Sequence, residues 1–157
     1  MLAAVAVGEV FGIGHNEIKK ALSDFKLPSM RLNLKEAGGV VIIDDTYNSN
    51  PYSMKAALDV LSSYKTCGKK IFVFSDMLEL GKASKKFHDE VGKDIAKSGI
   101  DTLIAIGDFS RYTVISAKRN GMKDAIYFEK KEEALNTLKG IAVPKDVLLF
   151  KGSRGMK

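Results

Sequence analysis

Polar and charged side chains gather directly after several short apolar segments of the chain. One such stretch contains Asp45 and places two asparagines around a serine, and the last one includes Lys-Gly-Ser-Arg. Asparagine side chains both donate and accept hydrogen bonds, and an arginine can clamp a carboxylate. These residue types are richer than turns require, and they predict a site for small polar ligands. The stretches are residues 44–51, 75–81, 107–108 and 151–155.

Alternating strands and helices must position these residues. Continuous apolar runs predict buried strands, and apolar residues at helical spacing predict helices between them. Such a pattern is typical of an α/β fold with a mostly parallel sheet and helices on both faces, which binds ligands at the carboxyl ends of its strands. We therefore expect the polar stretches to share one rim, with a β-hairpin near Arg31. The expected strands are 40–44, 70–75, 102–106, 125–128 and 147–150. Four helices are expected between them: the first starts at Pro51, and the others include residues 87–95, 109–120 and 134–138.

The first 27 residues form a separate pattern. Leu2, Val5, Val10 and Phe11 belong to a nearly all-round apolar helix, and a second amphipathic helix ends before Pro28. A helical hairpin of this size is too small to own a hydrophobic core. We therefore predict two units, a short helical hairpin at residues 1–27 and an α/β domain at residues 28–157.

Composition excludes several classes of protein. The chain has 157 residues and a net charge of +6, but its lysines are scattered among acidic neighbours, so no nucleic-acid partner is expected. The longest apolar run, Val40 to Ile43, is far shorter than a membrane span. A single cysteine, Cys67, excludes an internal disulfide and a zinc cluster and fits a reducing compartment.

Common catalytic motifs are also missing. The sequence has no Gly-x-x-x-x-Gly-Lys-Ser/Thr loop, and Gly12-Ile13-Gly14 lies between helices rather than after a strand. His15 and His88 are too isolated to form a metal pair, and His88 beside Phe87 is expected to be a surface or packing histidine rather than a base. A receiver-like acidic pocket after the first strand is disfavoured, because no aspartate stands at the expected end of the third strand. A non-catalytic, flavodoxin-like nucleotide- or ligand-binding module remains open as an alternative.

Three motifs carry a resemblance to a known family. They are IDDTYNSNPYSMKAAL, DMLELG and KGSRGMK. Together they resemble the carboxy-terminal domain of the Mur ligases, in particular of those that use D-alanyl-D-alanine, and the likeness covers essentially the whole chain. It implies a Rossmann-like fold for residues 28–157. It also implies that residues 1–27 are the helical remnant of a central ATPase domain.

The resemblance implies the following activity. Such ligases join D-alanyl-D-alanine to UDP-MurNAc-tripeptide through an acyl phosphate made from ATP with Mg²⁺, in the cytoplasm and in support of cell-wall synthesis. Their amino-terminal UDP-binding domain and the phosphate-binding loop of their central domain have no counterpart in this sequence. We therefore expect a domain that binds the dipeptide and closes over ATP, contains no catalytic residue or metal ligand of its own, and is inactive alone.

Single residues can be matched to the family's binding positions. The resemblance implies that Arg31 and Asp45 hold the ATP, chiefly its ribose. Met30 stands where the family usually has glycine, so we expect the loss of a positive-φ option there. Dipeptide binding is implied for Asn48, Ser49, Asn50, Ser153 and Arg154, with Asp76 as a weaker candidate.

Overall fold

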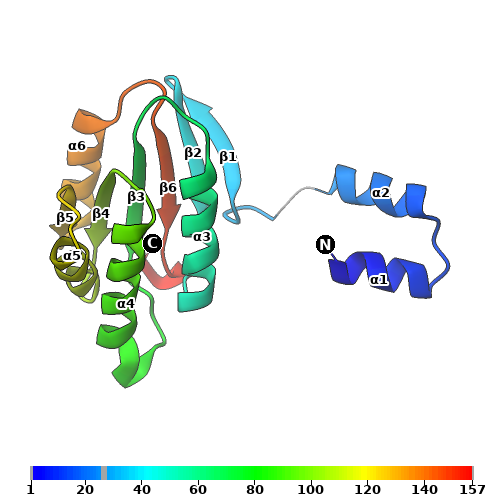
Figure 1. The fold of residues 1–157 in the computed structure, drawn as a ribbon, viewed down its shortest axis with the longest axis horizontal. Coiled ribbons are helices and arrows are strands. Elements are labelled where there is room, and N and C mark those ends of the chain that lie inside the picture. The colour runs from blue at the N-terminus through cyan, green and yellow to red at the C-terminus, as the bar shows by residue number, and fades with distance from the viewer. Residues whose placement is uncertain (1, 26–27, 157) are drawn as a thin grey trace.

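The computed structural model describes residues 2–25 and 28–156. It contains a six-stranded sheet, and from residue 40 onward strands and α-helices alternate along the chain (Figure 1). The strands are β1 (Asn33–Ala37), β2 (Val40–Asp45), β3 (Lys70–Ser75), β4 (Thr102–Ile106), β5 (Ala125–Phe128) and β6 (Val147–Lys151). The helices are α1 (Leu2–Val10), α2 (His15–Asp24), α3 (Pro51–Ser63), α4 (Ser84–Lys97), α5 (Ser110–Arg119) and α6 (Lys131–Ile141), with 3₁₀ turns η1 (Gly81–Ala83) and η2 (Arg154–Met156).

The strand order is β1-β2-β6-β3-β4-β5. Strand β1 pairs antiparallel with β2, whereas every other pair is parallel, with β6 inserted between β2 and β3. The carboxyl ends of β2, β6, β3 and β4 therefore lie side by side at one edge of the sheet. This topology confirms the predicted α/β fold with an amino-terminal hairpin, and it brings the polar stretches to one rim.

Helices cover both faces of the sheet, but unequally (Figure 1). The larger core joins α3, α4 and α5 to one face and includes Phe72, Phe74 and Leu103. The smaller core packs Ala134 and Leu138 of α6 against Ile71, Val73 and other residues of the opposite face. Burial of these apolar side chains is the main force that fixes the strand ends in register.

The helical hairpin of α1 and α2 lies apart from the sheet in Figure 1. The two helices meet where Gly8 faces Ile18, and a Cβ at Gly8 would lie 2.8 Å from the Ile18 Cδ1 atom. Other large apolar side chains of α1 are exposed, with Val10 at 84%. The predicted boundary after residue 27 falls next to residues outside the described part and remains a prediction.

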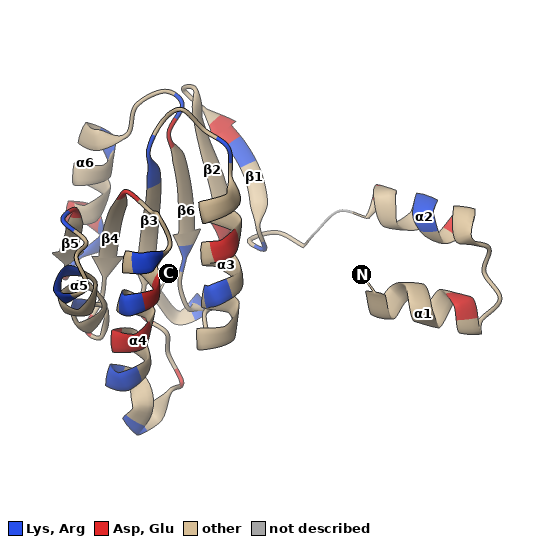
Figure 2. Ribbon diagram, viewed as in Figure 1, with Lys and Arg blue, Asp and Glu red and all other residues tan. Residues whose placement is uncertain are grey.

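Charged residues of both signs are interspersed on the helices (Figure 2). On α4, Lys86 lies 3.8 Å from Glu90 and Lys93 lies 3.1 Å from Asp89, so neighbouring charges pair at helical spacing. None of the helices in residues 2–25 and 28–156 combines the length and the apolar composition that crossing a membrane requires.

Candidate functional site

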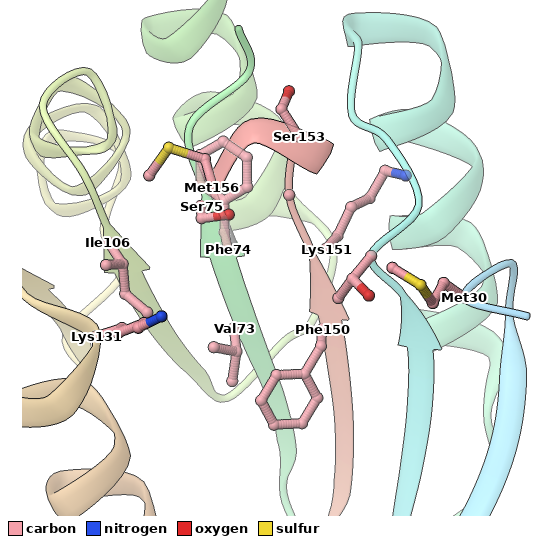
Figure 3. Close-up of a pocket in the computed structure, with 12 residues that line it drawn as sticks. Met30, Val73, Phe74, Ser75, Ile106, Lys131, Phe150, Lys151, Ser153 and Met156 are labelled. Atoms are coloured by element: carbon pink, nitrogen blue, oxygen red, sulfur yellow. The ribbon is translucent and has the colours of Figure 1, made fainter.

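A buried ion pair lies at the rim, between the ends of β2 and β6. The Lys151 Nζ atom lies 2.6 Å from Asp45 Oδ2 and donates to the Asn48 carbonyl at 3.0 Å. The side chain of Lys151 is 1% exposed and that of Asp45 is 15% exposed. Figure 3 shows Lys151 extending from β6 toward the loop between β2 and α3. One ammonium therefore holds both the Asp45 carboxylate and the backbone of the following loop.

Asp44, the preceding residue, points to a different set of partners. Its Oδ1 atom accepts from the Thr46 hydroxyl at 2.7 Å, and its Oδ2 atom lies 3.2 Å from Lys35 Nζ on β1. Burial alone would raise the pKa of Asp44, but the hydrogen bonds from Thr46 and Lys35 outweigh it and leave the pKa below its ordinary value. Adjacent strand residues point to opposite faces, so only Asp45 reaches Lys151.

Arg31 is presented by an unusual turn. Its neighbours Met30 and Leu32 both have positive φ angles, 64° and 50°. The expectation that methionine removes the positive-φ option is therefore wrong, because Met30 adopts the left-handed conformation despite its side chain. Such a conformation costs of order 1–2 kcal/mol for a residue other than glycine. The Arg31 guanidinium carbon lies 3.9 Å from the centroid of the Tyr47 ring.

The first hollow at the rim contains both residues that were expected to bind ATP. Arg31 and Asp45 line it, and Asn48, Asn50 and Lys151 border it. Its chemistry combines a planar cationic donor with a carboxylate whose second oxygen is not engaged by Lys151. Arginine suits phosphate or planar groups, and a carboxylate at a strand end suits sugar hydroxyls.

The loop that follows β2 is fixed by the start of α3. The Asn50 side chain accepts a hydrogen bond from the Ser53 backbone at 2.9 Å, and the Ser53 hydroxyl accepts one from the Asn50 backbone at 3.1 Å. This capping box leaves only the amide nitrogen of Asn50 for a ligand. Ser49 is 3% exposed and lines neither rim hollow, and its hydroxyl has no hydrogen-bond partner in the described part of the chain.

The loop after β6 lies close against its neighbours. A Cβ at Gly152 would overlap the Ser75 hydroxyl at the end of β3, so only glycine allows this approach. The Ser153 hydroxyl accepts a hydrogen bond from the Leu78 backbone at 2.9 Å, and the Ser153 backbone donates to the Asp76 carbonyl at 3.2 Å. Ser153 therefore ties the β6 loop to the β3 loop and sets the position of the next residue, Arg154.

A second hollow at the rim shares Tyr47 with the first. It is lined by side chains of opposite charge, Arg154 and Glu79, together with Tyr47, Asn48 and Ser153. Glu79 is held at a φ of 65°, in the left-handed region. Among the described residues, neither Arg154 nor Glu79 forms an ion pair within 4.0 Å. Arg154 is therefore available to a ligand carboxylate.

Asp76 does not point into either rim hollow. Its carboxylate is buried and accepts hydrogen bonds from the Ser110 backbone at 2.7 Å, the Ser110 hydroxyl at 2.6 Å and the Phe109 backbone at 3.1 Å. A carboxylate placed there caps the start of α5. The structure thus gives Asp76 a structural task in place of the ligand contact expected from the sequence.

His88 lies beneath this cap, fully buried on α4. Its Nδ1 atom lies 2.8 Å from the Ser84 carbonyl, and its Nε2 atom lies 3.1 Å from the donating Met77 backbone nitrogen. These partners fit a neutral ring that carries its proton on Nδ1. Burial lowers the pKa of His88, and the Ser84 carbonyl and the Asp76 charge oppose the shift only in part. Of the two expected environments for His88, surface or packed interior, the structure shows the packed interior.

A third, more apolar hollow lies on the face that α6 covers. Figure 3 shows Val73 and Phe150 on its floor, with Met30 at one side and Lys131 at the other. Of the sequence-predicted site residues, only Ser153 reaches it. The binding candidates other than Ser49 and Asp76 therefore gather in the two rim hollows rather than here.

Several residues of the rim hollows, among them Lys151, Tyr47 and Glu79, were not among the predicted site residues. For Lys151, the signal in the sequence was a lysine at the end of one apolar strand and an aspartate at the end of another. Tyr47 lines both hollows, but its ring could not be placed without knowing the turn at Arg31. In the described residues, no group of three His, Cys, Asp or Glu side chains could hold a metal ion, so these residues do not fit a Mg²⁺ site of their own.

Comparisons with known proteins identify the family of the chain. The family description "Mur ligase, glutamate ligase domain" matches residues 30–154. UDP-N-acetylmuramoyl-tripeptide–D-alanyl-D-alanine ligase of Bacillus subtilis is 40% identical over 99% of this chain, and the same ligase of Escherichia coli is 32% identical over 98%. The chain spans about a third of these relatives, 35% and 33% of their lengths.

Solved structures show the same likeness. A crystal structure of MurF from Acinetobacter baumannii matches 98% of the chain and 34% of its own length, with a TM-score of 0.85 and 33% identity. MurF from Thermotoga maritima, solved in complex with ADP, matches 98% of the chain and 34% of its own length, with a TM-score of 0.80 and 27% identity. The chain therefore belongs to the Mur ligase family, as a glutamate ligase domain of Rossmann-like fold.

Proposed function

We propose that this chain is the carboxy-terminal domain of an ATP-dependent ligase that adds D-alanyl-D-alanine to UDP-MurNAc-tripeptide. The observation that carries the proposal is the pair of adjoining rim hollows, one with Arg31 and Asp45 and the other with Arg154. The matched relatives bear the name of this ligase, and the chain covers a third of each. The remaining two thirds would supply the UDP-binding and phosphate-binding domains.

The first hollow is proposed to hold the nucleotide. Arg31 donates from a planar guanidinium to ATP, and Asp45 accepts from the ribose hydroxyls with the oxygen that Lys151 leaves free. Lys151 fixes the carboxylate before the ligand arrives, so less conformational entropy is lost on binding. A related MurF was solved in complex with ADP, which supports a nucleotide as the ligand class.

The second hollow is proposed to hold the dipeptide. Arg154 pairs with the carboxylate, and Asn48 and the free amide of Asn50 hydrogen-bond the peptide group from the adjoining loop. Ser49 and Ser153 act one layer below, by supporting that loop. Closure of this domain over the central domain would bring the dipeptide amine to the acyl phosphate and exclude water.

Two further points follow from the proposal. The described residues offer no phosphate-binding loop and no metal-ligand cluster, so we place Mg²⁺ and the catalytic residues in the remaining domains and expect no turnover from this chain alone. ATP and a UDP-linked peptide are cytoplasmic substrates, so we place the reaction in the cytoplasm.

The test is an assay of the full-length ligase that carries this chain. Phosphate release from ATP should require both UDP-MurNAc-tripeptide and D-alanyl-D-alanine, and the isolated 157-residue chain should release none. A full-length protein that binds nucleotide but forms no peptide bond would instead support the alternative, a flavodoxin-like binding module.

A further inference from the structure

We infer that Tyr47 is a shared positioning residue that holds Arg31 and Arg154, and thereby sets the affinity of both rim hollows. The tyrosine lines both hollows. For the identity of the two ligands, this inference rests on the proposed function. The arrangement of the three side chains does not depend on it.

The two guanidinium groups lie at the same aromatic ring. The guanidinium carbon of Arg31 is 3.9 Å from the ring centroid, and that of Arg154 is 5.9 Å from it. Both distances are within the roughly 6 Å range in which an aromatic face attracts a cation. The two arginines are 123 positions apart in sequence, and no hydrogen bond or ion pair links them in the described structure. The ring is therefore the element that they have in common.

Hydrogen bonds fix the backbone segment that carries the ring. The Tyr47 nitrogen donates to the Met30 carbonyl at 2.9 Å, directly beside Arg31. The next residue, Asn48, accepts from the buried ammonium of Lys151 at 3.0 Å. Tyr47 is 38% exposed, and its hydroxyl makes no hydrogen bond to the described residues. The ring face, and not the hydroxyl, is thus the part of the side chain that acts on the arginines.

This geometry predicts a specific pattern of losses. Arginine side chains have many rotamers. Holding an arginine in place before the ligand arrives reduces the side-chain conformational entropy that is lost on binding. Removing the ring should loosen both arginines at once. Loss of either arginine alone should affect only its own hollow.

The first experiment needs no ligand. In NMR spectra of the 157-residue chain, the Hδ protons of Arg31 and Arg154 should show upfield ring-current shifts, with the larger shift at Arg31. Tyr47→Leu should abolish both shifts, and Tyr47→Phe should retain them. Shifts that are unchanged in Tyr47→Leu would overturn the inference, whatever reaction the protein catalyses.

The second experiment uses the full-length ligase. Tyr47→Leu should raise the KM for ATP and the KM for D-alanyl-D-alanine, each by about twofold to fivefold, as expected for exposed cation–π contacts. Tyr47→Phe should restore both values, and Tyr52→Leu, at a tyrosine that is 91% exposed, should change neither. Thermal unfolding should be equal for the Leu and Phe variants.

The outcomes separate the two claims. An effect on only one KM, on neither, or an equal loss in Tyr47→Phe would overturn the positioning role. A full-length wild-type protein without ligase activity would overturn the proposed function, while the NMR result would still decide whether Tyr47 holds the two arginines.

Discussion

Asp45 and Asp76 occupy equivalent places in the fold but have different surroundings. Asp45 ends β2 and Asp76 directly follows β3, so both lie at the carboxyl edge of the sheet. The Asp45 side chain is 15% exposed and pairs with one ammonium, whereas the Asp76 side chain is 4% exposed and accepts three hydrogen bonds from the start of α5. The Asp45 carboxylate therefore has one oxygen that Lys151 does not engage, whereas the Asp76 carboxylate is fully engaged by hydrogen bonds within the protein.

The difference shows that a position at a ligand-binding edge does not make a carboxylate a ligand contact. What decides is the number of protein donors within reach. Three donors enclose Asp76, because the start of α5 lies within hydrogen-bond distance of its carboxylate, whereas α3 begins with its own Asn50 cap and leaves Asp45 to Lys151. Substitutions at the two positions should therefore fail in different ways.

The largest expected effect is on folding, at Asp76. Asp76→Ala should lower the free energy of unfolding by about 3–5 kcal/mol, because buried donors of Phe109 and Ser110 lose a charged acceptor. Urea denaturation of the chain measures this loss. Asp108→Ala, at an exposed aspartate of the loop between β4 and α5, should stay within about 0.5 kcal/mol of wild type. If Asp76→Ala left the free energy of unfolding almost unchanged but raised the KM of the full-length ligase for the dipeptide, Asp76 would instead be a ligand contact.

A smaller loss of stability is expected at the Asp45 pair. Lys151→Met should lower the free energy of unfolding by about 3 kcal/mol, since it leaves a partly buried carboxylate without its cation. In the full-length ligase it should also raise the KM for ATP, because Asp45 is no longer oriented. Lys35→Met removes the exposed partner of Asp44 and should cost at most about 1 kcal/mol. Equal losses in the two variants would contradict a special role for Lys151.

The neighbour of Asp76, His88, should make stability depend on pH. Its pKa is lowered in the folded chain, so the unfolded chain takes up the proton first as the pH falls. The free energy of unfolding should be fully retained above about pH 6.5 and should decline below it. His88→Gln should flatten this decline in denaturation curves at pH 7 and pH 5.5. His15→Gln, at an exposed histidine, is the control and should keep the wild-type slope.

The smallest effect on the α/β domain should follow removal of residues 1–27. In Figure 1 the α1–α2 hairpin stands apart from the sheet, and Leu2, Val10 and Phe11 are more than three-quarters exposed. The shortened chain should keep its free energy of unfolding within about 1 kcal/mol and should associate less in ultracentrifugation. Unfolding of the shortened chain would show that the hairpin belongs to the domain core.

The sequence predicted the fold well because apolar strands and helix spacing determine which faces are buried. The runs in β3, β4 and β6 were sufficient for the sheet, and the parallel topology then placed the polar stretches on one edge. The hydrogen-bond and ion-pair partners of the polar residues at this edge could not be predicted in this way. The capping role of Asp76 depends on α5 starting above it, and the buried state of Lys151 depends on β6 lying between β2 and β3. The positive φ of Met30 was likewise decided by tertiary contacts against local preference.

The most direct test of the two-hollow account compares Arg31→Ala with Arg154→Ala in the full-length ligase. The account predicts that Arg31→Ala raises the KM for ATP by about tenfold to a hundredfold and leaves the KM for D-alanyl-D-alanine near wild type. Arg154→Ala should do the reverse. If both variants change the same constant, or if neither changes one, the assignment of the two hollows to two substrates is wrong.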